Sequence, residues 1–586
     1  MKTLRKSSSK PAAVMQAFLI YLWLTVLSVL SVTDTYYTVY LLCGILALLC
    51  LYDNYKTGRS CPRKQKLILW IFSGLFTAAV TAANYTLFEP LTVLQNLFDG
   101  VCCLAGGFCV ANALLLYLTD RLPFCITEGN RKHPGILFLA VFGSIAVIDL
   151  LYLFFDAYPG ILTTDSISTM AQIIDGEGYN NTMPFWHTMT VKLFVSPGLA
   201  LFGDINAAIA CFHAAQILFM AACFGYVVMT LYQIGVPVWF LLGVYAVYAF
   251  QPHNIVYSVT LWKDIPFAGA AALFVTAFYR LLKHIGSSRW NYAAFLLGTL
   301  GFSLWRTNGW YAFLVTVLVM ALLLGRKEKK LLILMAVVLV FCWILINPVL
   351  DLLGVSETNL VEAFAVPMQQ VARVITEGRE LTQEETRLLG EIFWLDKVPQ
   401  MYDPLTVDPI KFETFRYDQV PFIRANSGLY LKLYLSLGLR YPGDYLKAWI
   451  EETKGYWNGG YFFWIYTKQM ESNSYGIANT VNENLISRLF AAAFRYMEKP
   501  AFLQSLTSIG LHIWALITCT LVNCIKKKEE FLLGIPLLVL VAGLWIGTPV
   551  YSEFRYAYPV FVTMPLILGV TVFGKSSPKD AEAAEE

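Results

Sequence analysis

Three basic residues lie in segments that are otherwise poor in positive charge. They are Lys263 within Leu261–Pro266, Arg306 within Trp305–Gly309 and Arg555 within Tyr551–Tyr556. Because each segment adjoins a long apolar run, the three cations are expected at one membrane depth. Charged groups at the edge of the hydrocarbon are costly unless they are paired or face a wet cavity. Together the three residues predict a phosphate-binding site.

Each of these residues, taken alone, also has a structural explanation. An arginine at a helix end can extend to the lipid headgroups. The neighbouring pairs Lys263–Asp264 and Glu553–Arg555 can be local ion pairs that hold helices together. The presence of three such cations at one depth favours the phosphate site over three separate structural roles.

An acidic candidate lies in residues 156–168, the loop that follows the fifth apolar run. Asp165 precedes Ser166 and a short helical stretch, so it could simply cap that helix. Thr164 could cap it instead, which would leave Asp165 facing a cleft. Burial raises the pKa of a carboxyl group and makes it a better acceptor for a hydroxyl proton. Asp165 is therefore the predicted general base.

His187 lies on the same predicted face, in Met183–Thr188. It could bond a substrate oxygen or a phosphate, or it could be a histidine satisfied at the membrane interface. His213 and His253 have no partner at ligand spacing, so a histidine-rich metal site is not indicated. A divalent metal held by Asp165 and Asp264 stays an open alternative.

The composition requires a membrane around these residues. Of the 586 residues, 57% are hydrophobic and 14% are charged, which excludes a water-soluble globular fold. The net charge is only +3 and the basic residues are spread over loops, so no nucleic-acid partner is expected. We expect an all-α polytopic protein of the cell membrane.

Hydropathy predicts about fourteen transmembrane helices. They cover Val14–Val32, Tyr37–Leu51, Leu67–Ala83, Val101–Leu118, Ile136–Phe155, Ala207–Leu231, Val236–Phe250, Ile265–Leu282, Tyr292–Trp305, Trp310–Leu324, Leu331–Ile346, Leu506–Cys524, Phe531–Ile546 and Tyr558–Val572. Loops rich in Lys and Arg alternate with loops that lack them, which places both termini in the cytoplasm and the candidate site outside. Pro197 and Gly198 interrupt Phe185–Phe202, so an interfacial or re-entrant helix is expected there.

Four of these motifs resemble those of the GT-C superfamily of integral-membrane glycosyltransferases, which use polyprenyl-phosphate sugars as donors. They are Pro159–Ser166, Trp262–Pro266, Arg306–Gly309 and Glu553–Tyr556. Within that superfamily the chain is most similar to a group of poorly characterised bacterial proteins that share an external segment like Val366–Arg373. The similarity covers about residues 134–573. It implies a GT-C-like fold and transfer of a sugar to an envelope glycan, lipid or protein, with inversion at the anomeric carbon.

The resemblance also implies roles for particular residues. Asp165 would be the base, with Asp156 as the fallback, and Asp264 matches a second acidic motif. The departing phosphate would be stabilised by Lys263, Arg306 and Arg555. The remaining substrate contacts would come from Tyr158, His187, Trp262, Asn308, Glu553 and Tyr556. The paired acidic residues of the superfamily's first loop are absent here, so no cofactor is certain and a divalent metal stays possible.

Five regions follow from these patterns. Residues 1–133 form an N-terminal four-helix membrane extension, and 134–346 form the GT-C-like catalytic membrane core. Residues 347–500 have soluble composition and are predicted to be an external, mainly helical domain. C-terminal transmembrane helices cover 501–574, and a cytoplasmic tail covers 575–586.

A second class of function fits the same charges. A charged membrane cavity also suits a transporter or flippase of a lipid-linked sugar or an envelope polymer. Inverted repeats or helices broken within the bilayer would favour transport, and the sequence has no convincing internal repeat. A scaffold for envelope assembly is a third reading, and it predicts that the charges do not meet.

Overall fold

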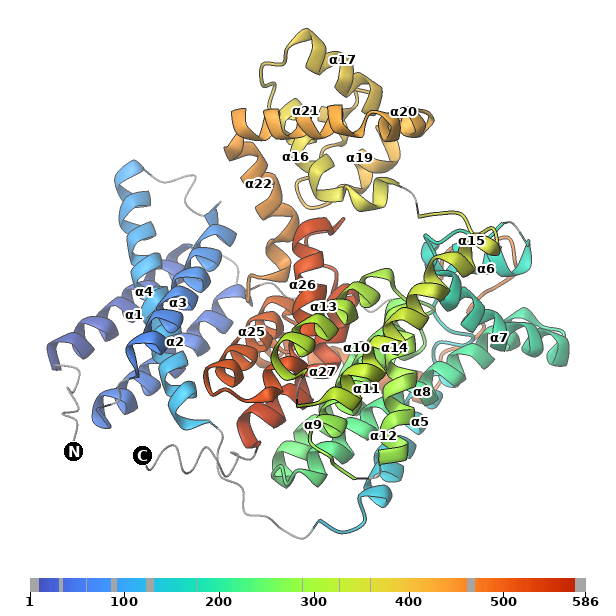
Figure 1. Cartoon of the computed structure of the whole chain (residues 1–586), viewed down its shortest axis with the longest axis horizontal. Coiled ribbons are helices and arrows are strands. Elements are labelled where there is room, and N and C mark those ends of the chain that lie inside the picture. Colours follow the sequence, from blue (N-terminus) through green and yellow to red (C-terminus); the bar gives the residue numbers. More distant parts are fainter. Residues whose placement is uncertain are drawn as a thin grey trace.

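The computed structural model describes residues 10–30, 35–58, 61–85, 92–122, 131–176, 178–286, 288–325, 327–358, 360–460 and 470–574. Within these ranges every regular element is helical, and β pairing is limited to isolated bridges (Figure 1). Ten of the described helices are long and apolar enough to cross a membrane. The predicted all-helical polytopic architecture is thus confirmed for the described residues.

The ten helices are α1 (Lys10–Leu30), α2 (Thr35–Lys56), α3 (Arg63–Ala83), α4 (Val93–Arg121), α5 (Pro134–Phe155), α8 (Ile205–Gln233), α11 (Asp264–Leu282), α13 (Thr307–Leu324), α14 (Lys329–Ile346) and α27 (Phe554–Phe573). The other four predicted spans are also helical but shorter, as α9 (Val238–Phe250), α12 (Ser288–Leu304), α25 (Ile509–Ile525) and α26 (Ile535–Gly547). The count of about fourteen spans therefore stays a prediction.

The remaining helices are shorter connections and the elements of the external segment. They are α6 (Thr164–Ile174), α7 (Phe185–Phe202), α10 (Pro252–Ser258), α15 (Pro348–Leu352), η2 (Leu360–Ala363), α16 (Ala365–Thr376), α17 (Gln383–Ile392), α18 (Val398–Met401), α19 (Asp408–Glu413), η3 (Tyr417–Gln419), α20 (Val420–Ala425), α21 (Ser427–Arg440), α22 (Pro442–Thr453), η4 (Lys454–Tyr456), α23 (Leu485–Glu498), α24 (Ala501–Ser505) and η5 (Glu529–Leu533).

Helix α7 is the stretch that we expected Pro197 and Gly198 to interrupt. It is one helix of 18 residues that continues through Pro197, so that expectation is wrong. Gly198 has a packing role instead, because a Cβ there would lie 2.9 Å from the Cα of Ala208 in α8. Helix α7 is not among the ten candidate spans, and it projects sideways from the bundle (Figure 1).

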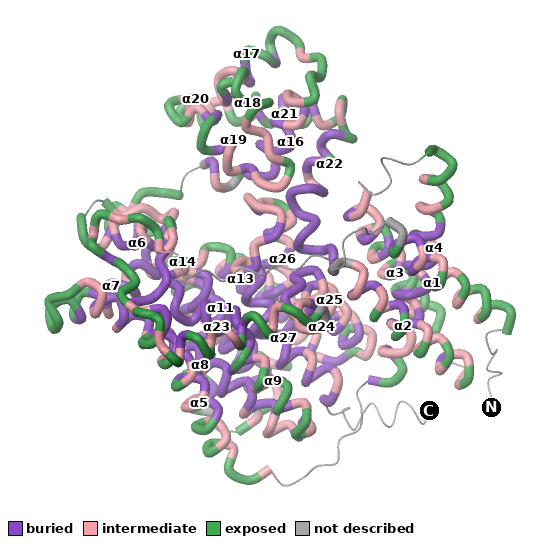
Figure 2. The backbone as a smooth tube through the Cα atoms, turned by 180° about the vertical axis from the view of Figure 1, so that it is seen from behind, coloured by how far each residue is buried: buried purple, intermediate pink, exposed green. Residues whose placement is uncertain are grey.

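Helix α11 lies at the centre of the molecule. Every residue from Asp264 to Leu282 is buried, and α8, α12 and α27 pack around it (Figure 2). Its 19 residues extend about 28 Å, close to the thickness of the hydrocarbon core. The chain therefore places polar groups at the two ends of α11 near opposite faces of the membrane.

The first four helices, α1 to α4, form a separate bundle with its own apolar core, which includes Trp23 and Val110 (Figure 1). Phe72 and Phe76 of α3 contact Trp514 of α25 edge to face, at centroid distances of 5.6 and 4.9 Å. These contacts attach the N-terminal bundle to the rest of the molecule.

The external segment also has its own core, formed by residues between Val361 and Tyr445. From there α22 leads back to the central bundle, where Tyr456 and Trp457 are buried (Figure 1). The later helix α23 packs on α5. The compact external core is therefore shorter than residues 347–500, because the last third of that segment packs against the membrane helices.

Candidate functional site

The loop after α5 is fixed to the segment before α11 by backbone pairing. Ile161 N donates to Val259 O at 2.7 Å, and Leu261 N donates to Ile161 O at 3.0 Å. The hydroxyl of Ser166 donates to Leu261 O at 2.8 Å. These bonds hold the start of α6 beside the start of α11.

The cap of α6 is neither of the two residues considered from the sequence. Thr163 is the N-cap, and its backbone N–H bonds the Ser166 hydroxyl at 2.9 Å in a capping box. The Thr163 hydroxyl also accepts a hydrogen bond of 2.7 Å from the indole N–H of Trp262. Since Thr163 caps the helix, the carboxylate of Asp165 in the first turn is available for other contacts.

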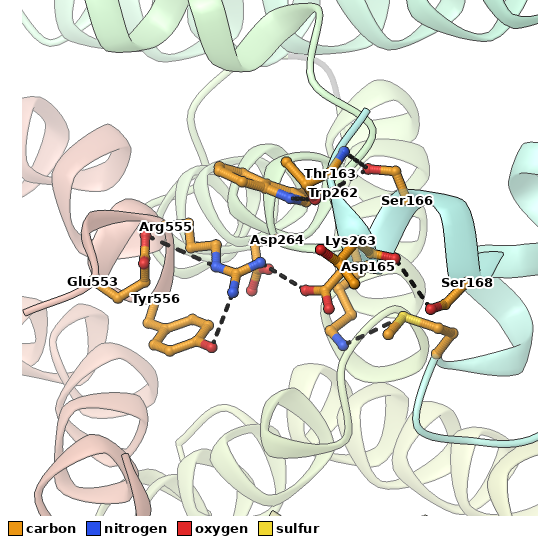
Figure 3. A network of polar contacts seen from close by, with 12 residues as sticks. Thr163, Asp165, Ser166, Ser168, Trp262, Lys263, Asp264, Glu553, Arg555 and Tyr556 are labelled. Atoms are coloured by element: carbon orange, nitrogen blue, oxygen red, sulfur yellow. Dashed lines mark hydrogen bonds and ion pairs between the residues drawn. The ribbon is translucent and has the colours of Figure 1, made fainter. Parts of the chain in front are cut away.

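Asp165 pairs with a residue of the last helix. The distance from Arg555 Nη1 to Asp165 Oδ2 is 2.7 Å, and Arg555 Nε lies 3.8 Å from Glu553 Oε1 (Figure 3). A second pair joins Arg306 Nη1 to Asp264 Oδ1 at 2.6 Å. The structure thus brings together residues from α6, α11, α13 and α27.

Lys263 lies in the same cluster. Its ammonium group donates to Thr182 O at 3.1 Å, and the electrostatic fields of Asp165 and Asp264 act on it. The cluster therefore contains equal numbers of cations and carboxylates, namely Lys263, Arg306 and Arg555 against Asp165, Asp264 and Glu553. The sequence had indicated an excess of positive charge, whereas the folded site balances it.

Two aromatic rings support the arginines. The guanidinium carbon of Arg555 lies 4.8 Å from the ring centre of Trp262 and 5.0 Å from that of Tyr556. That of Arg306 lies 4.9 Å from the ring centre of Tyr556. Cations at these distances over aromatic faces are attracted to them. Trp262 and Tyr556 thus hold the two guanidinium groups at one place.

Four helices begin at this cluster. Asp165 lies in the first turn of α6, and Lys263, Arg306 and Glu553 immediately precede α11, α13 and α27. Helix N-termini carry a partial positive charge and unpaired N–H groups, so they favour anions. In the structure, part of that demand is met by the three carboxylates of the cluster.

The protonation of Asp165 is set by two opposing effects. Burial raises the pKa of the Asp165 carboxyl, but Lys263, Arg555 and Arg306 together lower it below the usual value. The expected rise in pKa is therefore wrong for this state of the protein. Burial lowers the pKa of Lys263 and raises that of Glu553, in each case against the attraction of oppositely charged neighbours.

His187 is buried in α7 and approaches the ring of Phe212 edge to face, at a centroid distance of 6.4 Å. Burial, and to a smaller extent Lys263, lowers its pKa to about 3. Its Nε2 has no hydrogen-bond partner among the described residues. His187 is thus a neutral group near Lys263.

Three other predicted site residues lie outside the ion-pair cluster. Asp156 is buried at the end of α5, where its carbonyl accepts a hydrogen bond from Asn479 at 3.4 Å. Tyr158 stacks on Phe154 at a centroid distance of 6.2 Å. Asn308 is exposed in the first turn of α13. The structure gives these side chains no direct contact with Asp165 or Arg555 among the interactions of the described residues.

The cluster does not fit a divalent metal in this arrangement. Over the described ranges of the chain, no group of three or more His, Cys, Asp or Glu side chains could hold a metal ion. Asp165 and Asp264, the two carboxylates considered as ligands, each pair with an arginine instead.

The external domain contributes residues that the sequence did not indicate. Val407 N donates to Pro549 O at 3.0 Å, and Tyr551 N donates to Leu405 O at 2.8 Å, just before Arg555. The next residue, Asp408, is electrostatically coupled to Arg555 and Asp165, and burial raises its pKa. Its only sequence signal was an Asp-Pro turn, which gives no information about this partner.

The fold and the site define a helical, polytopic membrane protein with a half-buried ion-pair cluster at the N-termini of four helices. Residues 179–586 match a family described as a family of unknown function, DUF6020, and the chain belongs to that family. The match includes Lys263, Arg306 and Arg555 but begins after Asp165. No curated protein and no solved structure matches the chain.

Proposed function

We propose that this protein is a membrane glycosyltransferase that moves a sugar from a polyprenyl-phosphate donor to a cell-envelope acceptor on the external face. One observation carries the proposal: Lys263, Arg306 and Arg555 meet where four helices begin, beside Asp165. Charge-assisted hydrogen bonds from arginines and helix N-termini are the usual means of binding phosphate. Such a site at a membrane edge suits the phosphate of a lipid-linked sugar.

The two ion pairs differ in exposure, which suggests how a donor would enter. The side chain of Asp165 is 36% exposed, whereas that of Asp264 is 1% exposed. The donor phosphate would replace Asp165 on Arg555, while Asp264 would keep Arg306 in position. Loss of its nearest cation would raise the pKa of Asp165, so donor binding itself would create the base.

The proposed reaction then proceeds by a single displacement. Asp165 accepts the proton of the acceptor hydroxyl, and the acceptor oxygen attacks the anomeric carbon from the face opposite the phosphate. The bond from that carbon to the phosphate oxygen breaks, and its electron pair leaves with polyprenyl phosphate. Arg555, Lys263 and Arg306 would stabilise the charge that develops on the leaving group.

The proposal is tested with purified full-length protein and a panel of polyprenyl-phosphate sugars, by measuring released polyprenyl phosphate. Native protein should release it, and Asp165→Asn should abolish release while remaining folded. Asp351→Asn, which changes an exposed residue of α15, is the matched control. Full turnover in the Asp165→Asn variant would eliminate the assigned base, and no release from any donor would count against the transferase.

Transport of a lipid-linked sugar is the second candidate, and Asp149 favours it. This carboxylate lies within α5, is 2% exposed, and has no hydrogen-bond partner at Oδ1. Ionisable groups inside membrane helices often mark ion or substrate pathways. Proteoliposomes containing a fluorescent lipid-linked sugar distinguish the two: translocation that Asp149→Asn abolishes, without release of polyprenyl phosphate, would establish transport.

A further inference from the structure

A second polar site lies at the other end of α11. Arg280 is sixteen residues after Asp264, about 24 Å further along the helix axis. It lines a cavity of about 380 Å³ between the ends of α11, α12 and α14. The cavity is therefore near the membrane face opposite the ion-pair cluster.

Arg280 is buried, with 3% of its surface exposed, and all its hydrogen-bond partners are neutral. Nε donates to Asn291 Oδ1 at 2.8 Å, and Nη1 donates to Thr230 Oγ1 at 3.0 Å and Gln233 Oε1 at 2.6 Å. The guanidinium carbon lies 5.0 Å from the ring centre of Tyr226. These bonds orient Arg280 but do not neutralise it.

No carboxylate of the described residues pairs with Arg280, in contrast to Arg306 and Arg555. A buried charge without an opposite charge is costly, and the same three helices could be joined by a neutral hydrogen-bonding side chain. The fixed guanidinium therefore requires an anion that the chain itself does not supply.

The geometry leaves one edge of the guanidinium open. Nη2 makes none of the hydrogen bonds above, and Gly286 lies beside it in the turn after α11. A Cβ at Gly286 would lie 2.6 Å from Nη2, and the φ angle of +69° is one that favours glycine. Arg280 and Gly286 both line the cavity, so the missing side chain leaves room beside Nη2.

The opposite wall is the start of α14, where Lys329 and Lys330 line the cavity. Glu328, the N-cap, makes no side-chain capping bond, so the first N–H groups of α14 have no acceptor from it. Lysines at a helix N-terminus are unfavourable with the helix dipole unless an anion lies nearby. With Lys327 included, the lining has four cations and one carboxylate.

We propose that this cavity binds a phosphate-bearing anion between the guanidinium of Arg280 and the amide end of α14. The ligand chemistry is a phosphate group at a membrane edge. Its source is either the headgroup of an anionic phospholipid or a soluble phosphate compound. The site is independent of the proposed transferase reaction.

The test measures binding to the full chain in neutral detergent. Inorganic pyrophosphate is titrated calorimetrically, and dioctanoyl phosphatidylglycerol is compared with dioctanoyl phosphatidylcholine by native mass spectrometry. Replacing Lys329 and Lys330 together by Gln should weaken binding at least about tenfold. A double Gln variant of Lys397 and Lys432, which are exposed in the external domain, is the matched control.

Arg280→Gln should abolish binding, but this change could also disturb the helix packing. The Lys329/Lys330 variant alters exposed side chains and so separates binding from folding. Binding of pyrophosphate identifies a soluble source, and binding of phosphatidylglycerol alone identifies a lipid headgroup. Failure of native protein to bind either probe, or unchanged binding in the Lys329/Lys330 variant, would overturn the proposal.

Discussion

Arg555 and Asp165 are 390 residues apart in the chain, yet Arg555 Nη1 and Asp165 Oδ2 are only 2.7 Å apart. The pair joins the last described helix to the first short helix after α5. Arg555 is positioned by rings on two sides and Asp165 by the capping box of α6. The contact therefore depends on the whole fold between the two residues.

Replacing Arg555 by Lys should weaken use of the donor. A lysine keeps the charge but loses the planar fork that can bind phosphate oxygens and stack on Trp262. We expect KM for a polyprenyl-phosphate sugar to rise about tenfold with a smaller change in kcat, as measured by steady-state release of polyprenyl phosphate. Arg424→Lys, in an exposed pair with Glu357, should leave KM unchanged. An unaltered KM in Arg555→Lys would argue against phosphate binding.

His187 should make the protein less stable in mild acid. Its pKa is about 3 in the fold and 6.5 as the ordinary value, so the unfolded chain binds more protons between these limits. The stability from burying the neutral ring is complete above pH 6.5 and is lost as pH falls toward 3. His187→Asn should therefore show a smaller decrease in Tm from pH 7 to pH 5 than native protein. His133→Asn, at an exposed position, should match native behaviour; parallel Tm curves for all three proteins would refute this.

Gly309 should be intolerant of a side chain. A Cβ there would lie 1.7 Å from the carbonyl oxygen of Phe302 and 2.8 Å from the ring of Phe267, so the turn that carries Arg306 would have to move. We expect Gly309→Ala to lose about 1–3 kcal/mol of stability or more, seen as a lower Tm. Gly243→Ala in α9 is the control, because no atom lies within 4 Å of its Cβ position. Equal Tm values for both variants would contradict this account.

Tyr456 should stabilise the approach to the site through its hydroxyl. It is buried, and its oxygen accepts hydrogen bonds from the Thr548 hydroxyl at 3.0 Å and from Glu553 N at 3.1 Å. Tyr456→Phe leaves that amide without this acceptor, which should cost about 1–3 kcal/mol and reduce donor use. Tyr430→Phe is the matched control because its hydroxyl has no hydrogen-bond partner. If the two variants unfold at the same temperature, the hydroxyl of Tyr456 has no such role.

Hydropathy located the membrane helices because an apolar run long enough to cross the bilayer is a property of consecutive residues. All fourteen predicted spans coincide with helices, although only ten meet the length for crossing. The convergence of Lys263, Arg306 and Arg555 was also expected, since each precedes a helix on one face. Side-chain identity and position relative to a span were enough for that expectation.

The partners of these charges could be decided only by tertiary structure. Arg306 pairs with Asp264, which the sequence had assigned to its neighbour Lys263, and Arg555 reaches Asp165 from the far end of the chain. Those partners lower the pKa of Asp165, whereas burial alone would have raised it. Consecutive residues determine where a helix lies. The field at a carboxylate is the sum over groups that only folding brings within a few ångströms.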